Sequence, residues 1–274
     1  METQIITLFC IIVDFLNVID FKDDSQAQMS TSEVMLTTIV AAKFFKGNIE
    51  ITRMFLRDHK YVPKMLSKSR LNRRTHKIDI AIWEALQGFL RKIFNATNFE
   101  KEYAMDSFPV PVCKNIRIRR CKIYKEEQYR GFNASNKTYF FGLKVHMICT
   151  TKREPIEIIF SPGSISDTTI YKQFEYDIPE GSIAYGDGAY NDYEHEDFLK
   201  ESADITILAI RKSNMIRQHP KALTSLIHRF RRNIETTFSE ITSLFPKSIH
   251  AVTAKGFELK LMCFIFAYGL SKLY

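Results

Sequence analysis

Residues 139–160 read YFFGLKVHMICTTKREPIEIIF and predict a β-hairpin. Two runs rich in β-branched and aromatic residues, 139–150 and 156–160, flank a polar, proline-containing link. Further along, residues 182–185 and 205–210 read as short strands separated by a helical stretch at 193–200. A hairpin-led sheet followed by strand, helix, strand and helix predicts an α/β fold with a mixed sheet.

A short strand is also expected before the hairpin, at residues 103–105, ending at Asp106. The following segment carries Pro109 and Pro111, which confine it to a sheet edge or an irregular extension. After the last strand, apolar residues recur at helical spacing between Leu223 and Ile241 and predict an amphipathic helix with Glu235 at the margin of its apolar stripe.

Residues 1–98 carry helical patterns. Ser30 and Glu33 have the spacing of a capping box before the apolar stretch 34–45. Lys46-Gly47-Asn48 reads as a helix stop and turn, and a long helix is expected to end near Asn95. We therefore expect a helical domain over residues 1–98 and an α/β domain over residues 99–274.

The positive charge is concentrated in the helical region. Residues 53–77 hold nine basic residues against one acid, Asp58, which equals the whole net charge of +8 and indicates an acidic polymer as partner. Short helices, a Gly turn and a basic third element resemble a helix-turn-helix layout, in which Arg70, Arg73 and Arg74 are the candidate DNA contacts. The alternative is that these arginines form a solvated helix face.

A second basic run precedes Glu235. Residues 209–234 contain seven Lys or Arg and no Asp or Glu. An acid that holds a cation, beside bases that hold a polyanion, is what a metal-dependent phosphodiester-cleaving enzyme requires. The alternative is that Arg231 and Glu235, four residues apart, form an ordinary surface ion pair.

Three acids stand where a fold places functional groups. Asp106 and Asp187 follow predicted strands, Glu235 projects from a helix, and Gly186 and Gly188 flank Asp187 to permit close approach and unusual dihedrals. Two hard cations about 3.5–4 Å apart need such a carboxylate set. Taken singly, each acid has a structural alternative. Asp106 is then a turn residue, Asp187 forms an Asx turn and Glu235 is an ion-pair partner.

Other acids are expected to lie outside this set. Asp167 is expected to cap a helix that begins near Thr168. Asp192 is likewise not counted among the three metal-binding acids. Glu240 lies about 140° around the helix from Glu235, so the two side chains cannot point at one site.

Composition points to a globular intracellular protein. The chain is 45% hydrophobic and 26% charged, and its five Cys form neither an even set nor a Cys-x-x-Cys pair. The apolar start, residues 5–13, lacks the basic region and cleavage site of a signal peptide, and residues 261–270 are about half the ~20 residues of a membrane span. We expect no membrane partner and a cytoplasmic, nucleoid-associated location.

Six motifs in order resemble one known family: DSFPVPVC (106–113), YFFGLKVH (139–146), SPGS (161–164), GDGAY (186–190), IETTFSEI (234–241) and SIHAVTAKGFE (248–258). They are similar to bacterial insertion-sequence transposases of the DDE class, most closely the insertion-sequence-982 type, and the stretch 29–33 resembles the N-terminal region of that group.

The resemblance implies an RNase H-like catalytic domain preceded by a DNA-binding domain. It implies that Asp106, Asp187 and Glu235 are a catalytic triad that binds two Mg²⁺ ions, for which Mn²⁺ can substitute, and that Arg231 contacts DNA beside the scissile phosphate, with Arg232 adjacent. The wider class often has Tyr and Lys around this Glu, where this chain has His228 and Thr242. His228 is either a phosphate donor or a packed helix residue, and Lys255 is either a DNA contact or a solvated lysine.

The implied function is a transposase that binds terminal inverted repeats, cuts double-stranded DNA and joins the 3′-hydroxyl ends to target DNA. Synapsis of two ends implies a homodimer. Two alternatives remain: a catalytically silent DNA-binding relic, and an RNase H-like nuclease without strand transfer.

Overall fold

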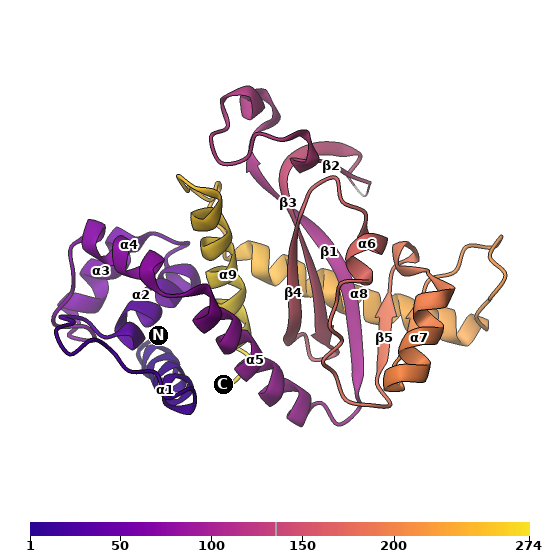
Figure 1. Ribbon diagram of the computed structural model, residues 1–274, viewed down its shortest axis with the longest axis horizontal. Helices are drawn as coiled ribbons and strands as arrows, with labels where there is room; N and C mark the ends of the chain where they lie inside the picture. Colours follow the sequence, from indigo (N-terminus) through magenta and orange to yellow (C-terminus); the bar gives the residue numbers. More distant parts are fainter. Residues whose placement is uncertain (135) are drawn as a thin grey trace. The chain divides into compact units, whose positions relative to one another are not determined.

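The computed structural model describes residues 1–134 and 136–274 (Figure 1). The chain divides by packing into two compact units: residues 1–90 with 241–274, and residues 91–240. The first is helical and the second contains the sheet. The predicted domain boundary at 98/99 falls after helix α5 (Ile80–Thr97), whereas the packing boundary lies within it and returns the C-terminal segment to the helical unit.

The helical unit is built on helix α2 (Thr31–Phe44), which is buried along almost its whole length. Its remaining helices are α1 (Glu2–Val18), α3 (Ile49–Asp58), α4 (Lys68–Lys77) and α9 (Ala254–Leu270), together with the first part of α5. Both α2 and α9 are apolar around most of their circumference, so each must be enclosed by neighbours, and they pack on each other. Trp83 stacks on Phe266 within this core, with ring centroids 5.9 Å apart.

The expected local signals in the helical unit are present. The Ser30 hydroxyl accepts the Glu33 N–H, and the Glu33 carboxylate accepts the Ser30 N–H at 2.8 Å, so the predicted capping box is confirmed. Lys46 and Gly47 have positive φ angles of 48° and 76° in the turn before α3, where only glycine is free of strain. The tight turn joins α2 to α3, while the basic helix α4 follows a longer link, residues 59–67.

The second unit contains a six-stranded mixed sheet. Its strands are β1 (Glu102–Cys113), β2 (Arg130–Asn133), β3 (Thr138–Thr150), β4 (Pro155–Pro162), β5 (Ile183–Gly186) and β6 (Thr206–Ala209). The order is β2-β3-β1-β5-β6, and β4 pairs with β3. Strands β3 and β4 form the predicted antiparallel hairpin, whereas β1, β5 and β6 run parallel.

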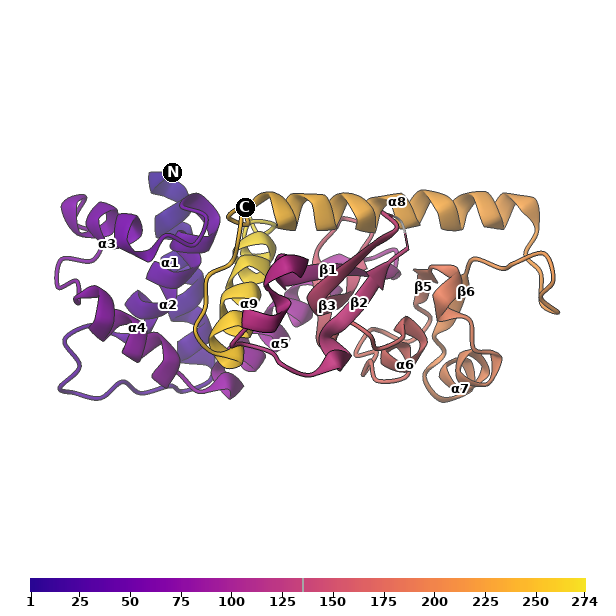
Figure 2. The ribbon, with the colours of Figure 1, turned by 90° about the horizontal axis from the view of Figure 1, so that it is seen from above.

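Helices cover both faces of this sheet. Figure 2 shows α8 (Lys221–Ser243) along one face, with α6 (Asp167–Tyr171) and α7 (Tyr193–Ala203) on the other. The apolar stripe of α8 packs through Phe230 on Tyr185 of β5, at 4.3 Å between ring centroids, and through Phe238 on Phe108 of β1, at 4.6 Å. The mixed sheet and its helices are consistent with the expected RNase H-like fold.

One strand differs from expectation. Asp106 does not end the first strand, because β1 continues through both prolines to Cys113. Beyond Met105, β3 is the only strand that β1 pairs with among the described residues, and β5 no longer runs beside it. Pro109 and Pro111 are tolerated because this half of β1 has a free side that needs no amide donor.

No helix in the described ranges has the length and apolar character needed to cross a bilayer.

Candidate active site

Strand register places Asp106 beside Asp187. Strands β1 and β5 are parallel neighbours, and their last paired residues are Met105 and Gly186. Each aspartate is the next residue along its strand, so the two lie side by side at the point where β5 ends. Adjacent strands are about 4.8 Å apart, which brings the two carboxylates within reach of one ligand.

Gly186, the residue before Asp187, packs tightly against Met105 and Tyr190. A Cβ atom built on it would lie 2.9 Å from Met105 Cε and 3.2 Å from Tyr190 Cβ. The expected unusual dihedrals are absent, because neither Gly186 nor Gly188 is among the described residues with positive φ. Asp187 instead caps a short 3₁₀ helix, Gly188–Tyr190, by accepting the Gly188 N–H.

Helix α8 contributes the third acid and a basic residue one turn away. The packing of Phe230 and Phe238 on the sheet turns Arg231 and Glu235 toward the two aspartates. Arg231 Nη2 lies 3.3 Å from Asp187 Oδ2 and 3.5 Å from Glu235 Oε1, and Arg231 Nε lies 3.8 Å from Asp106 Oδ2. The ion pair between Arg231 and Glu235 is therefore one edge of a cluster in which a single guanidinium faces three carboxylates.

Burial differs among the three acids. The Asp106 side chain is 13% exposed, compared with 36% for Asp187 and 54% for Glu235. Burial raises the pKa of Asp106 to about 7; the Ser107 N–H and Arg231 oppose this rise, and Asp187 and Asp167 add to it. Binding of a cation at Asp106 therefore requires the loss of a proton near neutral pH.

The donor set suits a hard divalent cation, because three carboxylates converge and Mg²⁺ prefers oxygen ligands. The described residues, however, contain no group of three or more His, Cys, Asp or Glu in an arrangement that could hold a metal ion. The guanidinium of Arg231 lies among the three acids and supplies the positive charge. The three acids therefore fit a metal by their chemistry, while in the structure Arg231 lies between them.

A hollow of about 410 Å³ opens beside Glu235 and is lined by Ser225, His228, Arg231, Arg232 and Glu235. His228 and Arg232 are exposed. The structure therefore brings together His228, Arg231 and Arg232, three of the seven residues predicted to bind DNA.

The other four predicted DNA contacts lie in the helical unit. Arg70, Arg73 and Arg74 line a groove on α4 together with Lys77. Arg74 is partly engaged, since it donates to the Met29 carbonyl at 3.1 Å and lies 3.7 Å from Asp23. Lys255 is exposed in the first turn of α9.

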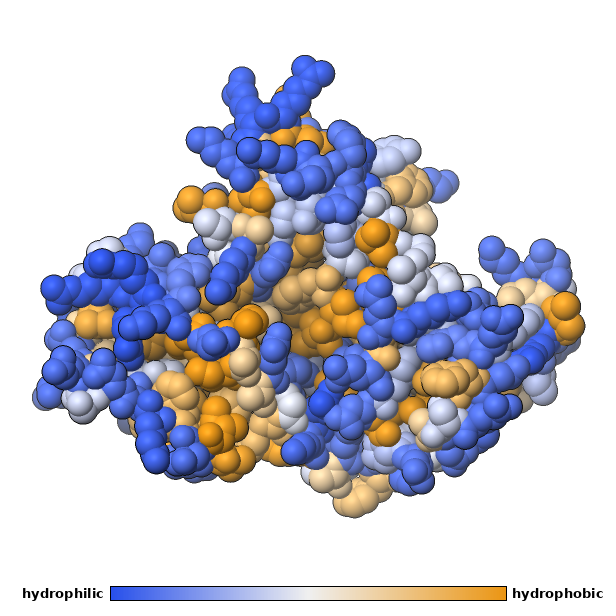
Figure 3. All heavy atoms as spheres, in the orientation of Figure 1, coloured by the Kyte–Doolittle hydropathy of each residue, from blue (hydrophilic) through white to orange (hydrophobic). Residues whose placement is uncertain are grey.

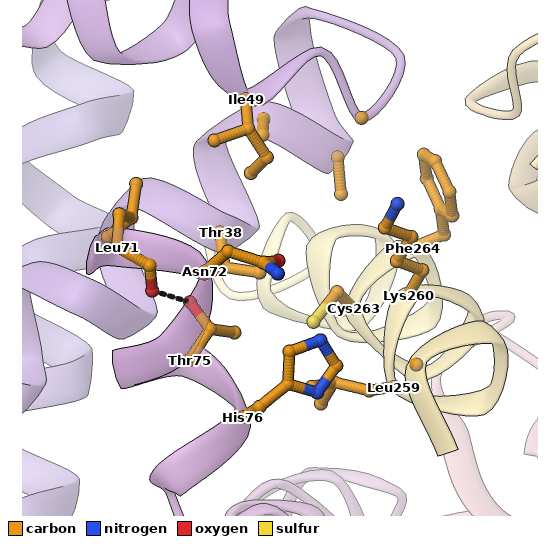
Figure 4. A pocket seen from close by; sticks show the side chains of 14 residues that line it. Thr38, Ile49, Leu71, Asn72, Thr75, His76, Leu259, Lys260, Cys263 and Phe264 are labelled. Atoms are coloured by element: carbon orange, nitrogen blue, oxygen red, sulfur yellow. Dashed lines mark hydrogen bonds between the residues drawn. The ribbon is translucent and has the colours of Figure 1, made fainter. Parts of the chain in front are cut away.

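Lys255 also lies near a small pocket of the helical unit. This pocket, of about 40 Å³, is lined mainly by apolar side chains, with His76 and Cys263 pointing toward it (Figure 4). Burial lowers the pKa of His76, and the charges of Lys260 and Lys255 lower it further.

Asp167 is not the helix cap that the sequence suggested. Ser166 is the N-cap of α6, because its hydroxyl accepts the Thr169 N–H. The Asp167 carboxylate instead accepts from Ser107 Oγ at 3.1 Å and from Lys144 Nζ at 3.0 Å. Asp167 therefore supports the strand that carries Asp106, from the sheet face opposite α8.

Sequence reasoning missed this supporting group. Lys144 and His146 are two residues apart on β3 and therefore lie on the same face of this otherwise apolar strand. Two polar residues at that spacing inside a buried strand are the signal that could have revealed the supporting group. His146 is fully buried and shares a 2.8 Å hydrogen bond with Ser161. Burial lowers the pKa of His146 to about 4, with opposing influences from Asp167, which raises it, and Lys144, which lowers it.

The other two acids set aside from the sequence have structural roles. Asp192 caps α7 by accepting the His195 N–H, and Glu240 pairs with Arg153.

A family model described as the transposase DDE domain matches residues 97–270, which is well over half of the chain. The matched segment contains Asp106, Asp187 and Glu235. The search of curated proteins and the search of solved structures found no match.

Proposed function

Because the chain belongs to the transposase DDE domain family, we propose that it is an active transposase that cuts DNA at the ends of its own mobile element and joins the freed 3′-hydroxyls to target DNA. One observation carries this proposal: three carboxylates from two strands and a helix converge on one guanidinium. A family member that had lost its activity would be under no constraint to keep this set together.

Asp106, Asp187 and Glu235 are proposed to hold two Mg²⁺ ions, with Mn²⁺ as a substitute. Bound there, such ions would activate the attacking water or 3′-hydroxyl and stabilise the leaving oxygen. Asp106 would have to release its proton to serve as a ligand, since burial raises its pKa to about 7.

Arg231 is proposed to exchange partners during the reaction. Without DNA its guanidinium offsets the repulsion among the three acids. With DNA it binds a phosphate beside the scissile bond, since a planar guanidinium matches phosphate oxygens in a bidentate fashion. Arg232 and His228, exposed in the same hollow, extend this contact along the backbone.

The helical region is proposed to recognise the element ends. Arg70, Arg73 and Arg74 on α4, with Lys255 on α9, supply the positive charge for this contact. We retain the functional division into a DNA-binding domain over residues 1–98 and a catalytic domain over residues 99–274. A homodimer is proposed for the complex that holds two ends.

The test is Mg²⁺-dependent nicking of a plasmid that carries the gene with its flanking genomic DNA. Asp187→Asn should abolish nicking and leave DNA binding intact, because it removes one carboxylate charge and keeps the side-chain shape. Glu194→Gln, which alters an exposed acid on α7, is the matched control and should nick like the wild type.

The outcomes separate the alternatives. Binding without nicking at any Mg²⁺ or Mn²⁺ concentration would overturn the enzymatic proposal and leave a DNA-binding relic. Nicking without joining of a pre-cut end to a second duplex would instead assign the chain to nucleases that lack strand transfer.

A further inference from the structure

A third basic segment, separate from the two described above, lies between β1 and β2. Residues 114–122 read KNIRIRRCK and contain five basic residues and no acid. We name this segment the basic arm; its centre is a 3₁₀ helix, Asn115–Arg120, beyond the end of β1 (Figure 1). All five basic side chains are exposed.

The charge of the basic arm is not neutralised by the protein. Within residues 1–134 and 136–274, none of its five bases lies within ion-pair distance of a carboxylate. Exposed arginines elsewhere in the same unit do find partners: Arg130 pairs with Glu127 and Arg217 with Asp197. Five unpaired positive charges held close together repel one another, so this arrangement favours an anionic partner.

The basic arm is nevertheless fixed to the sheet. The Asn115 side chain donates to the Tyr139 carbonyl at 2.8 Å. Just beyond the arm, buried Tyr124 stacks on Tyr129 with ring centroids 4.0 Å apart. The arm therefore presents its charges from an anchored base.

Apolar side chains lie exposed among these charges. Ile116 is 90% exposed, and Phe132 and Tyr139 form a pair of rings 5.0 Å apart that are 49% and 63% exposed. Figure 3 shows hydrophilic side chains extending from this part of the molecule with apolar atoms between them. Basic residues mixed with exposed apolar and aromatic tips are typical of nucleic-acid surfaces.

We propose that the basic arm is a third DNA-binding site, which contacts the phosphate backbone of the duplex at a distance from the carboxylate cluster. This inference rests on the proposed action on DNA. Cys113 lies seven residues beyond Asp106 on one strand, which at about 3.3 Å per residue is about 23 Å. At about 3.4 Å per base pair, the arm reaches phosphates roughly seven base pairs from the bond that is cut. A second copy of this chain is a poorer partner, because its net charge is also +8.

The experiment measures how duplex binding by the full-length protein depends on salt. The probe is a labelled random-sequence duplex of about 40 base pairs, and the slope of log binding constant against log NaCl concentration counts the phosphate contacts. Arg117→Ala/Arg119→Ala/Arg120→Ala should reduce the magnitude of that slope by about three, since each lost contact removes about 0.9. The matched control, Lys92→Ala/Lys152→Ala/Lys247→Ala, loses the same charge from other exposed positions and should keep the wild-type slope.

A conservative variant separates charge from structure. Arg117→Lys/Arg119→Lys/Arg120→Lys should retain the wild-type slope if the arm acts through its charge, whereas a structural role for the arginines would make both triple variants bind weakly. Equal slopes for Arg117→Ala/Arg119→Ala/Arg120→Ala and for the control Lys92→Ala/Lys152→Ala/Lys247→Ala would overturn the inference. Wild-type DNA binding would in that case still support the proposed function. Absence of wild-type duplex binding would overturn both. Loss of a dimer in size-exclusion chromatography, with an unchanged slope, would assign the arm to contact with a second copy instead.

Discussion

The guanidinium of Arg231 lies 3.3 Å from the carboxylate of Asp187 and, through the same nitrogen, 3.5 Å from that of Glu235. Its Nε atom lies 3.8 Å from Asp106, the most buried of the three acids. A single positive charge therefore offsets the repulsion among three negative groups. A divalent cation would bind the same three acids, so Arg231 and the cation should compete for this position.

Replacing Arg231 tests this competition without measuring catalysis. Arg231→Gln leaves the three acids without their shared cation, so its melting temperature in EDTA should fall below that of the wild type. Addition of Mg²⁺ should then raise the melting temperature of the variant more than that of the wild type. A gain of about 1 kcal/mol corresponds to roughly 2–4 °C for a chain of this size.

Arg232→Gln provides the control, because Arg232 is the exposed neighbour on the same helix turn. Its response to Mg²⁺ should equal that of the wild type. An Arg231→Gln protein whose melting temperature ignores Mg²⁺ would show that these acids do not form a cation site.

Two ion pairs, each between an acid on α7 and an arginine in the segment after β6, test how burial sets the contribution of an ion pair to stability. Arg211 and Glu196 are 4% and 8% exposed, whereas Arg217 and Asp197 are 47% and 51% exposed. Arg211→Met leaves a buried carboxylate unpaired and should lower the free energy of unfolding by about 3–5 kcal/mol. Arg217→Met should have a much smaller effect, since water solvates the remaining carboxylate.

Urea denaturation followed by circular dichroism measures both variants. Adding Glu196→Gln to Arg211→Met should recover part of the loss, because the unpaired buried charge is then removed. Equal costs for Arg211→Met and Arg217→Met would contradict the burial argument.

Local signals in the sequence were sufficient for much of the fold. The capping box at Ser30, the turn at Gly47 and the β3–β4 hairpin depend on residues close together in the chain, and each is present as predicted. The positions after Met105 and Gly186 were also recognised as candidate sites. Their pairing in one register, which makes Asp106 and Asp187 neighbours, could not be read from the sequence because it depends on parallel strands distant in the chain.

The errors arose where tertiary contacts override local patterns. Asp167 has the composition of a helix cap, but Ser107 and Lys144 from other strands bind its carboxylate and Ser166 takes the capping role. β1 continues past its prolines because one of its edges is free. The basic arm was not noticed, since its significance lies in the lack of acidic partners, which only three-dimensional contacts reveal.

The capping box at the start of α2 should make a measurable contribution to stability. Ser30→Ala removes the acceptor for the Glu33 N–H and should lower the free energy of unfolding by about 1 kcal/mol. Ser25→Ala alters an exposed serine in the preceding link and should change stability by less than about 0.5 kcal/mol. Denaturation curves for the two variants, recorded together, would contradict this assignment if their midpoints coincided.

Glu157 should make stability depend on pH in a predictable direction. Its carboxylate is buried in β4 and accepts the N–H groups of Glu175 and Tyr176 at 2.7 and 3.2 Å. Burial raises the pKa of Glu157 to about 7; the two N–H groups and Arg91 oppose the rise, and the charge of Glu175 adds to it.

Between about pH 4.5 and pH 7 the folded protein keeps a proton on Glu157 that the unfolded chain has released. The free energy of unfolding should therefore fall by about 3 kcal/mol from this residue alone as pH rises through this window. Above the window it should level off. Glu157→Gln cannot titrate, so its stability relative to the wild type should increase by that amount from pH 4.5 to pH 7.5. Glu175→Gln, an exposed neighbour, should show a much smaller change. A difference between Glu157→Gln and wild type that stays constant with pH would show that folding does not raise the pKa of Glu157.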